Sequence, residues 1–211
     1  MIKNLIFDLG GVVLDIRYEN VAEAFARQGV PNTESFFSRH AQSHEMDLFE
    51  EGKMTSPQFR NYVRHMAGLP FSDTQVDECL NAILLTIPER RVALLTQLKK
   101  RYGTFLFSNT NAINYDSFTA TARQQYGFDV FERCFHATYF SHLMGVRKPS
   151  LDGFKRIVKE QRLVAAETLF IDDNPNNVAA ARMAGLQGFH LERGNDIAQL
   201  FERRPAAFPL F

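Results

Sequence analysis

Four short motifs along the chain carry carboxylate, hydroxyl, amide or ammonium groups, and each follows a short apolar run or lies in the loop behind one. In chain order the candidate residues are Asp8, Ser108 with Asn109, Lys148, and the adjacent pair Asp172 and Asp173. Any one of them alone is also explained by a turn, a helix cap or a solvated loop. Their shared placement is informative, because open α/β sheets bind ligands at the carboxyl ends of their strands.

The three aspartates suit phosphoryl transfer by a covalent route. A carboxylate can attack phosphorus and form an aspartyl-phosphate, which divides one difficult step into two easier ones. Asp8 is the candidate nucleophile and a metal ligand, and Asp172 and Asp173 can supply further oxygen atoms to Mg²⁺. Three carboxylates around one point repel one another strongly, so the cluster itself predicts a metal ion, a lysine or both.

The remaining polar groups suit binding of the transferred phosphate. Ser108 and Asn109 can donate hydrogen bonds to phosphate oxygens, and Lys148 can neutralise charge on the phosphate and on the crowded carboxylates. Lys148 is therefore expected to serve both binding and catalysis. Its neighbour Arg147 is equally compatible with a phosphate contact and with a surface position.

The elements that would position these residues alternate along the chain. Short apolar runs predict strands at residues 3–8, 104–107, 134–140, 168–171 and 186–191. Amphipathic or alanine-rich segments predict helices at 91–102, 152–161 and 177–184. Strands that alternate with helices predict an α/β fold, namely a Rossmann-like, doubly wound parallel sheet.

Residues 17–90 interrupt that alternation. They contain amphipathic patches at 21–28, 36–49, 56–67 and 74–85, without a convincing strand. We therefore expect an α/β core domain formed by residues 1–16 and 91–211, and a small all-helical cap domain, residues 17–90, inserted after the first strand. A cap that closes over the strand ends excludes water, which favours small substrates over macromolecules.

The four motifs together resemble those of the haloacid dehalogenase (HAD) superfamily. The matching segments are FDLGGVV at 7–13, FSNT at 107–110, RKP at 147–149 and IDDNPNN at 171–177. The resemblance implies a Rossmann-like core with a cap after the first motif. It also implies Mg²⁺ held by Asp8, Asp173 and the backbone oxygen of Gly10, with Asp172 acting directly or through water.

Within this superfamily, the motifs look most like those of the branch that contains bacterial α-D-glucose-1-phosphate phosphatase and the N-terminal phosphatase domain of soluble epoxide hydrolases. That likeness implies a phosphatase acting on a small phosphorylated metabolite, with a sugar phosphate favoured. Because the cap sets specificity and the fold does not, the substrate itself stays open.

Two positions depart from the superfamily pattern. Most HAD phosphatases carry a second aspartate two residues after the nucleophile, which protonates the leaving group and then activates water. Here that position is Gly10, and the final acidic position of the fourth motif is Asn177. The general acid/base is therefore unassigned; Asp15 is a weak substitute that is better explained as a turn or helix cap. Slow turnover of sugar phosphates is expected.

Two other functions compete with the phosphatase. A metal-free haloacid dehalogenase would use the same aspartate to displace halide and would also tolerate Gly10, but the Asp172–Asp173 pair suits Mg²⁺ rather than an alkyl halide. A catalytically weak HAD-like binding protein is supported by Gly10 alone. A phosphomutase would normally need the missing acid. We therefore favour the phosphatase.

A possible metal pair and two further segments have simpler explanations. His40 and His44 are four residues apart, which can place a metal pair on one helix face. No third ligand is evident, so a solvated or substrate-facing helix is favoured. Residues 50–53 (EEGK) predict a turn that could reach the mouth of the site. The proline-containing tail, residues 203–211, is expected to be irregular.

Composition excludes several partners. Lys+Arg and Asp+Glu both number 24 in 211 residues, so the formal net charge is zero and nucleic-acid binding is not expected. No apolar stretch approaches the roughly 20 residues that span a bilayer, and the acidic residues near the start argue against a signal peptide. Cys79 and Cys134 lack metal-ligand spacing and are expected to be reduced, which predicts a cytoplasmic protein. The sequence leaves the oligomeric state open.

Overall fold

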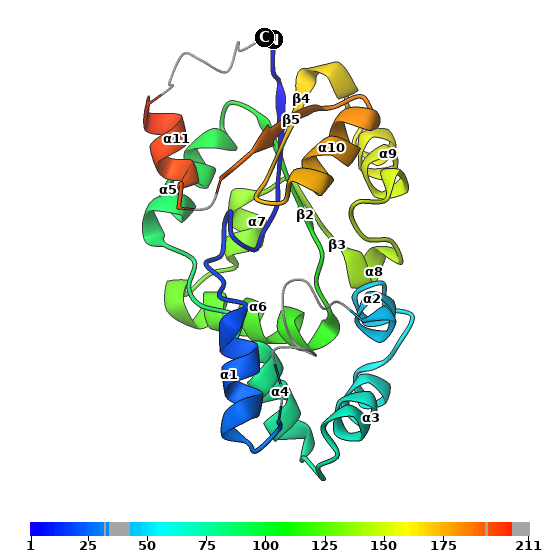
Figure 1. The fold of residues 1–211 in the computed structure, drawn as a ribbon. Helices are drawn as coiled ribbons and strands as arrows, with labels where there is room; N and C mark the ends of the chain where they lie inside the picture. Colours follow the sequence, from blue (N-terminus) through cyan, green and yellow to red (C-terminus); the bar gives the residue numbers. More distant parts are fainter. Residues whose placement is uncertain (32, 34–42, 193, 204–211) are drawn as a thin grey trace.

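The fold is built on a five-stranded, all-parallel sheet with the strand order β3-β2-β1-β4-β5 (Figure 1). The computed structural model describes residues 1–31, 33, 43–192 and 194–203. The strands are β1 (Asn4–Phe7), β2 (Gly103–Ser108), β3 (Ala137–Phe140), β4 (Thr168–Asp172) and β5 (Gln187–His190). The predicted α/β class and parallel doubly wound sheet are confirmed.

The central strand, β1, explains why the four motifs meet. It pairs with β2 on one side and with β4 on the other, and Phe7 lies opposite Leu106 and Ile171. Parallel strands end at the same edge of a sheet, so the residues that follow β1, β2 and β4 gather there. The apolar runs that predict these strands are buried on both faces, as expected of a parallel sheet covered by helices.

The two faces of the sheet bury separate hydrophobic cores. Along β1, Leu5 and Phe7 point into one core while Ile6 points into the other. The helices with residues in the first core are α5 (Glu89–Leu98), α6 (Ala112–Tyr126), α7 (Val130–Cys134) and α11 (Ile197–Arg203). The second core is formed with α9 (Leu151–Glu160) and α10 (Pro175–Met183). The prediction of helices near 91–102, 152–161 and 177–184 is confirmed.

The third strand begins later than predicted. The apolar pattern at 134–140 predicted a strand throughout, but Cys134 ends helix α7 and β3 starts at Ala137. The prediction was wrong for the first residues because Asp129 caps a helix just before them. The Asp129 Oδ1 atom accepts hydrogen bonds from the backbone N–H groups of Phe131 and Glu132 at 2.9 and 3.0 Å.

Four helices lie wholly within residues 17–90 in the part of the chain that the structure describes. They are α1 (Glu19–Arg27), α2 (His44–Glu50), α3 (Ser56–Ala67) and α4 (Asp73–Asn81). Capping boxes start α3 at Thr55 and α4 at Ser72. The patch predicted at 36–49 is helical from His44 onward, and residues 36–42 lie outside the described residues. We call α1–α4 and their connections the helical unit.

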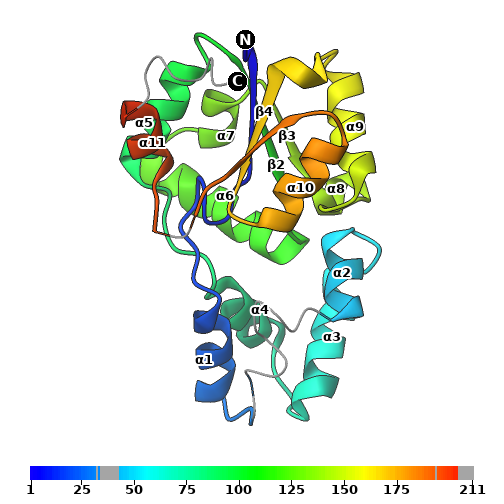
Figure 2. The ribbon, with the colours of Figure 1, turned by 45° about the horizontal axis from the view of Figure 1, so that its top comes forward.

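The helical unit has its own hydrophobic core and lies beyond the carboxyl ends of the strands (Figure 2). Ile113 of α6 joins this core, where α4 packs against α6. A short helix of the sheet side, α8 (Ser141–Met144), meets α2. The predicted boundaries of core and cap, at residues 17 and 90, stay a prediction. None of the helices in the described ranges is both long and apolar enough to cross a membrane.

Candidate active site

The ends of three neighbouring strands bring the predicted acidic residues together. Asp8 follows β1 directly, Asp172 is the last residue of β4, and Ser108 is the last residue of β2. The backbone N–H of Asp8 donates to the carbonyl oxygen of Ile171 at 2.9 Å, which continues the ladder beyond the assigned strand. The side chains therefore converge because of strand register, although they are 64 to 164 residues apart in the sequence.

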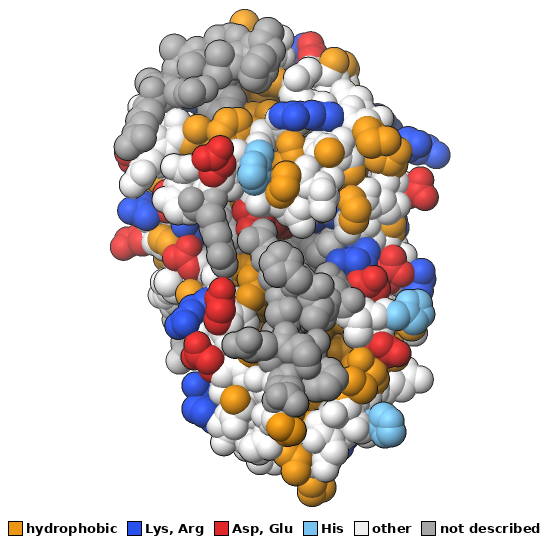
Figure 3. Space-filling model, in the orientation of Figure 1, with side chains coloured by type: hydrophobic (Ala, Val, Ile, Leu, Met, Phe, Trp, Pro, Cys, Tyr) orange, Lys and Arg blue, Asp and Glu red, His pale blue; other side chains and the backbone are white. Residues whose placement is uncertain are grey.

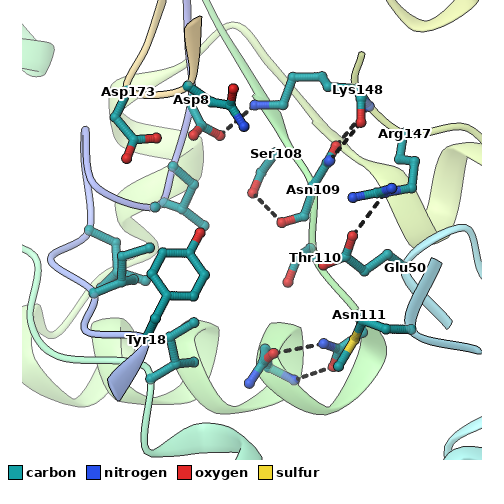
Figure 4. A pocket seen from close by; sticks show the side chains of 18 of the residues that line it. Asp8, Tyr18, Glu50, Ser108, Asn109, Thr110, Asn111, Arg147, Lys148 and Asp173 are labelled. Carbon is teal, nitrogen blue, oxygen red and sulfur yellow. Dashed lines mark hydrogen bonds and ion pairs between the residues drawn. The ribbon is translucent and has the colours of Figure 1, made fainter. Parts of the chain in front are cut away.

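Lys148 lies between two of the carboxylates. Its Nζ atom is 2.6 Å from Asp8 Oδ1 (Figure 4). The same atom is 2.7 Å from Asp172 Oδ2, and only 1% of the lysine side chain is exposed. An ammonium buried to this degree needs opposite charge beside it, and both ion pairs are also hydrogen bonds. The structure therefore brings three of the predicted site residues into direct contact.

Asn109 holds the lysine loop through a reciprocal pair of hydrogen bonds. Its side-chain Nδ2 donates to the backbone oxygen of Lys148 at 2.9 Å, and its Oδ1 accepts from the backbone N–H of Lys148 at 2.8 Å. The sequence suggested that this amide binds phosphate. In the structure it positions the backbone that carries the ammonium, a contact between residues 39 apart that no local pattern shows.

Asp172 is fully buried and accepts hydrogen bonds on both oxygens. Its Oδ1 accepts from the backbone N–H of Asn174 at 2.7 Å, and its Oδ2 accepts from Asn177 Nδ2 at 3.0 Å in addition to Lys148. This explains one departure from the superfamily pattern. An aspartate at position 177 would be unable to donate to the Asp172 carboxylate and would instead repel it.

Asp8, Asp172 and Asp173 form a group that could hold a cation. One carboxylate oxygen from each lies within 4.8 Å of the other two, and no other group of three His, Cys, Asp or Glu side chains in the described part of the chain does so. Gly11 has a φ of +76°, and a Cβ there would lie 3.0 Å from the Asp173 carboxylate. Three carboxylates beside one ammonium leave excess negative charge, so the donor set fits a divalent cation with oxygen ligands.

The electrostatics of the nucleophile candidate reflect the same crowding. Burial, followed by the charge of Asp172, raises the pKa of Asp8 from 3.8 to about 7, although Lys148 acts in the opposite direction. Burial alone would lower the pKa of Lys148, but the Asp172 and Asp8 carboxylates raise it overall. The lysine therefore stays charged, while Asp8 needs a further cation to ionise readily at neutral pH.

The position of the usual general acid is packed against an apolar side chain. A Cβ on Gly10 would lie 3.0 Å from the terminal methyl group of Ile16. Asp15, the weak substitute, forms an ion pair with Arg91 at 2.8 Å and does not line the same cavity as Asp8. The structure therefore does not bring Asp15 to the site.

The site opens into a cavity of about 690 Å³ between the strand ends and the helical unit (Figure 4). All the predicted site residues except the buried Asp172 line it. Tyr18, which had no distinguishing signal in the sequence, also lines it, and its hydroxyl points toward the Asp8 end in Figure 4. Its side chain is placed by the path of the chain between β1 and α1, which only the tertiary structure defines.

Arg147 connects the two sides of the cavity. Its Nη1 donates to Asp47 at 2.7 Å, and its Nε lies 2.9 Å from Glu50 at an angle outside that of a hydrogen bond, so the second contact is an ion pair. Both acidic residues belong to α2. Glu50 lies at the cavity, as the prediction for residues 50–53 suggested. His44 starts α2, and His40, the other residue of the possible metal pair, lies outside the described residues.

The chain resembles known phosphatases over nearly its full length. It is 27% identical to D-ribitol-5-phosphate phosphatase of Bacteroides thetaiotaomicron, over 94% of this chain and 96% of that protein. It is 29% identical to a sesquiterpene phosphatase of Aspergillus oryzae, over 90% and 89% of the two proteins. A crystal structure of a HAD family enzyme from B. thetaiotaomicron, an aspartate-to-alanine mutant in complex with magnesium and inorganic phosphate, has a TM-score of 0.90 and 34% identity, covering 95% of this chain and 99% of the other.

The structure combines a parallel sheet of an α/β protein with an aspartate directly after its central strand and a carboxylate cluster bridged by a lysine. Residues 2–185 match the haloacid dehalogenase-like hydrolase family. The chain belongs to this family, and the predicted superfamily and enzyme class are confirmed.

Proposed function

We propose that this protein is a Mg²⁺-dependent phosphatase that hydrolyses a small phosphate monoester through an aspartyl-phosphate on Asp8. The observation that carries the proposal is the Lys148 ammonium, buried between Asp8 and Asp172 with Asp173 close by. The named activities of the relatives support the same reaction class. The Asp172–Asp173 pair suits Mg²⁺ rather than the alkyl halide of a dehalogenase.

The metal would be held by Asp8, Asp173 and the backbone oxygen of Gly10, with Asp172 contributing directly or through water. The bound magnesium in the similar HAD enzyme supports this assignment. When bound, Mg²⁺ neutralises charge on the phosphate oxygens and on the carboxylates. Asp172 has a second task, since its hydrogen bonds hold the lysine in place.

The reaction proceeds in two displacements. An oxygen of Asp8 attacks phosphorus, the bond from phosphorus to the ester oxygen breaks, and the alcohol leaves with a proton. Water then attacks the aspartyl-phosphate, which releases inorganic phosphate and restores Asp8. Ser108 and Asn109 bind the transferred group, Asn109 through its backbone N–H because its side chain is engaged by Lys148, and the ammonium of Lys148 stabilises charge on the phosphate.

Gly10 affects the choice of substrate, because no carboxylate stands beside the leaving oxygen. The alcohol then takes its proton from water, so esters of acidic alcohols should turn over faster than those of ordinary alcohols. The sugar phosphate favoured by the motifs stays a prediction, since the relatives are named for a polyol phosphate and a terpenoid phosphate.

The cytoplasmic location predicted from the sequence is part of the proposal. Cys79 and Cys134 are both buried and free, which suits a compartment that keeps thiols reduced. The substrate is a small metabolite, because the reacting residues lie at a cavity roofed by the helical unit. Neither a nucleic acid nor a membrane is expected as a partner.

Phosphate release from 4-nitrophenyl phosphate and a panel of metabolite phosphates tests the proposal. The comparison uses Mg²⁺ and EDTA, wild type and Asp8→Asn, with Asp116→Asn on the exposed face of α6 as the matched control. Release that needs Mg²⁺, is lost in Asp8→Asn and persists in Asp116→Asn is expected. Absence of release from a folded wild type, together with halide release from 2-haloacids, would assign the dehalogenase reaction instead.

A further inference from the structure

Among the described residues, the wall of the cavity that faces the carboxylates is mainly apolar. The helical unit supplies side chains from all four of its helices and the segment after α4, among them Val21, Met46, Phe59, Tyr62, Leu80 and Ile83. Of the described residues of this unit that line the cavity, only Glu50 is charged, and it is ion-paired with Arg147. Hydrophobic side chains also reach the surface in the lower half of the molecule, where this unit lies (Figure 3).

Several polar side chains around the cavity are engaged by the protein itself. Asn111 accepts from the backbone N–H of Asn114 at 3.0 Å and donates to its side chain at 2.7 Å. Asn114 donates in turn to Asn81 at 2.9 Å, and Ser43 caps α2. A sugar or polyol would have to compete with these bonds or bury its hydroxyl groups unpaired, at a cost of roughly ten-fold in affinity for each unpaired group.

One end of the cavity is charged and the opposite wall is mainly apolar. We therefore propose that the substrate is the phosphate monoester of a hydrophobic alcohol with an alkyl or isoprenyl chain, rather than a sugar or polyol phosphate. The inference rests on the proposed phosphatase function and adds the class of the leaving group. The phosphate sits at the carboxylates and Lys148, and the chain extends along the apolar wall of the helical unit. This overrides the sugar phosphate suggested by the motifs, because the motifs describe only the phosphate end of the cavity.

The size of the cavity sets a quantitative expectation. A volume of about 690 Å³ is far more than a phosphate group fills and lies within the range of sites for drug-sized ligands. Each added methylene that is buried should raise kcat/KM about four-fold until the apolar wall is covered. A polyol chain of the same length should show no such gain.

The test compares primary phosphates, so that the leaving groups differ little in basicity. Phosphate release is measured with Mg²⁺ for ethyl, butyl, hexyl and octyl phosphate and for ribitol 5-phosphate. We expect kcat/KM to rise steadily along the alkyl series and to exceed that of ribitol 5-phosphate at least ten-fold for octyl phosphate. This series uses the wild-type protein and needs no variant.

A pair of variants on one helix then locates the apolar wall. Met46 and Leu48 both lie on α2 and are half-buried, but only Met46 lines the cavity. Met46→Gln should lower the ratio of kcat/KM for octyl over ethyl phosphate by about ten-fold. Leu48→Gln should leave that ratio within two-fold of the wild-type value.

The outcomes separate the two proposals. A flat alkyl series with ribitol 5-phosphate preferred would overturn the hydrophobic leaving group while leaving the phosphatase intact. An equal loss of the chain-length effect in Met46→Gln and Leu48→Gln would overturn the placement of the chain along the helical unit. Absence of release from every ester, 4-nitrophenyl phosphate included, would overturn the phosphatase function itself.

Discussion

Replacing Asp8 by asparagine should abolish activity and yet stabilise the metal-free protein. The pKa of the Asp8 carboxyl rises from 3.8 to about 7 on folding, chiefly because the group is buried beside Asp172. At about 1.4 kcal/mol per pH unit, this difference corresponds to about 4 kcal/mol of unfavourable free energy for holding the ionised carboxylate in the folded state. Asparagine is neutral, and its oxygen can still accept a hydrogen bond from Lys148, which keeps its ion pair with Asp172.

The stability difference between Asp8→Asn and the wild type should depend on pH. The folded protein binds the Asp8 proton more tightly than the unfolded chain does, so this contribution to stability is complete below about pH 4 and is lost as the pH rises toward 7. Relative to the wild type, the variant should gain about 2 kcal/mol in the free energy of unfolding at pH 5 and about 4 kcal/mol at pH 8.

Urea unfolding in EDTA at pH 5 and pH 8 measures these gains. Far-ultraviolet circular dichroism is the suitable probe, because the chain contains no tryptophan. Mg²⁺ should stabilise the wild type more than the variant and so narrow the difference between them, because the ion binds the folded state through the carboxylates. Asp116→Asn, an exposed control on α6, should be unchanged at both pH values.

The reasoning would be refuted by an Asp8→Asn protein that is equal to or less stable than the wild type at pH 8 in EDTA. It would also be refuted by a gain that does not grow between pH 5 and pH 8, since a constant gain cannot come from a titrating carboxyl. Either result would mean that burying the ionised Asp8 carboxylate beside Asp172 does not destabilise the folded protein by the amount expected.

Four further substitutions probe the surroundings of the site. Gly11→Ala should weaken Mg²⁺ binding about ten-fold in calorimetric titration, because the backbone has a φ of +76° and the added methyl group would press on Asp173. Asn109→Ala should lower kcat about ten-fold or more and the free energy of unfolding by about 1–3 kcal/mol, through loss of both hydrogen bonds to the lysine loop. Arg147→Met and Asp47→Asn should lower kcat/KM to a similar extent, about two- to ten-fold, if their ion pair holds the helical unit closed. A loss confined to the arginine variant would assign that side chain to the phosphate.

The phosphate end of the site is predictable from the sequence because it depends on strand ends. Each apolar run identifies a buried strand, and parallel strands end at a common edge. Asp8, Ser108 and the Asp172–Asp173 pair therefore had to lie close together once a parallel sheet was expected. Lys148 follows from charge, since three neighbouring carboxylates need a cation.

Helices without a strong local pattern were harder to predict. The α6 and α11 helices were not predicted. Residues 134–140 were predicted as one strand, although Cys134 belongs to α7 and β3 starts at Ala137. A short apolar run is compatible with a strand and with a buried helix. Here the cap at Asp129 favours a helix for the residues that follow it directly. Such caps are visible locally, so this error was avoidable.

The sequence by itself determined the fold class, the family and the residues at the carboxyl ends of the strands, because these follow from short-range patterns of burial and from the order of the motifs. Only the tertiary structure decided how Asn109 is used, which residues Arg147 pairs with, and which side chains of the helical unit face the carboxylates. Those contacts join residues that lie tens of positions or more apart, and they depend on how helices pack across a cavity. An amphipathic helix has the same sequence pattern whichever partner it packs against. No local pattern therefore identifies the group that a cavity between helices binds.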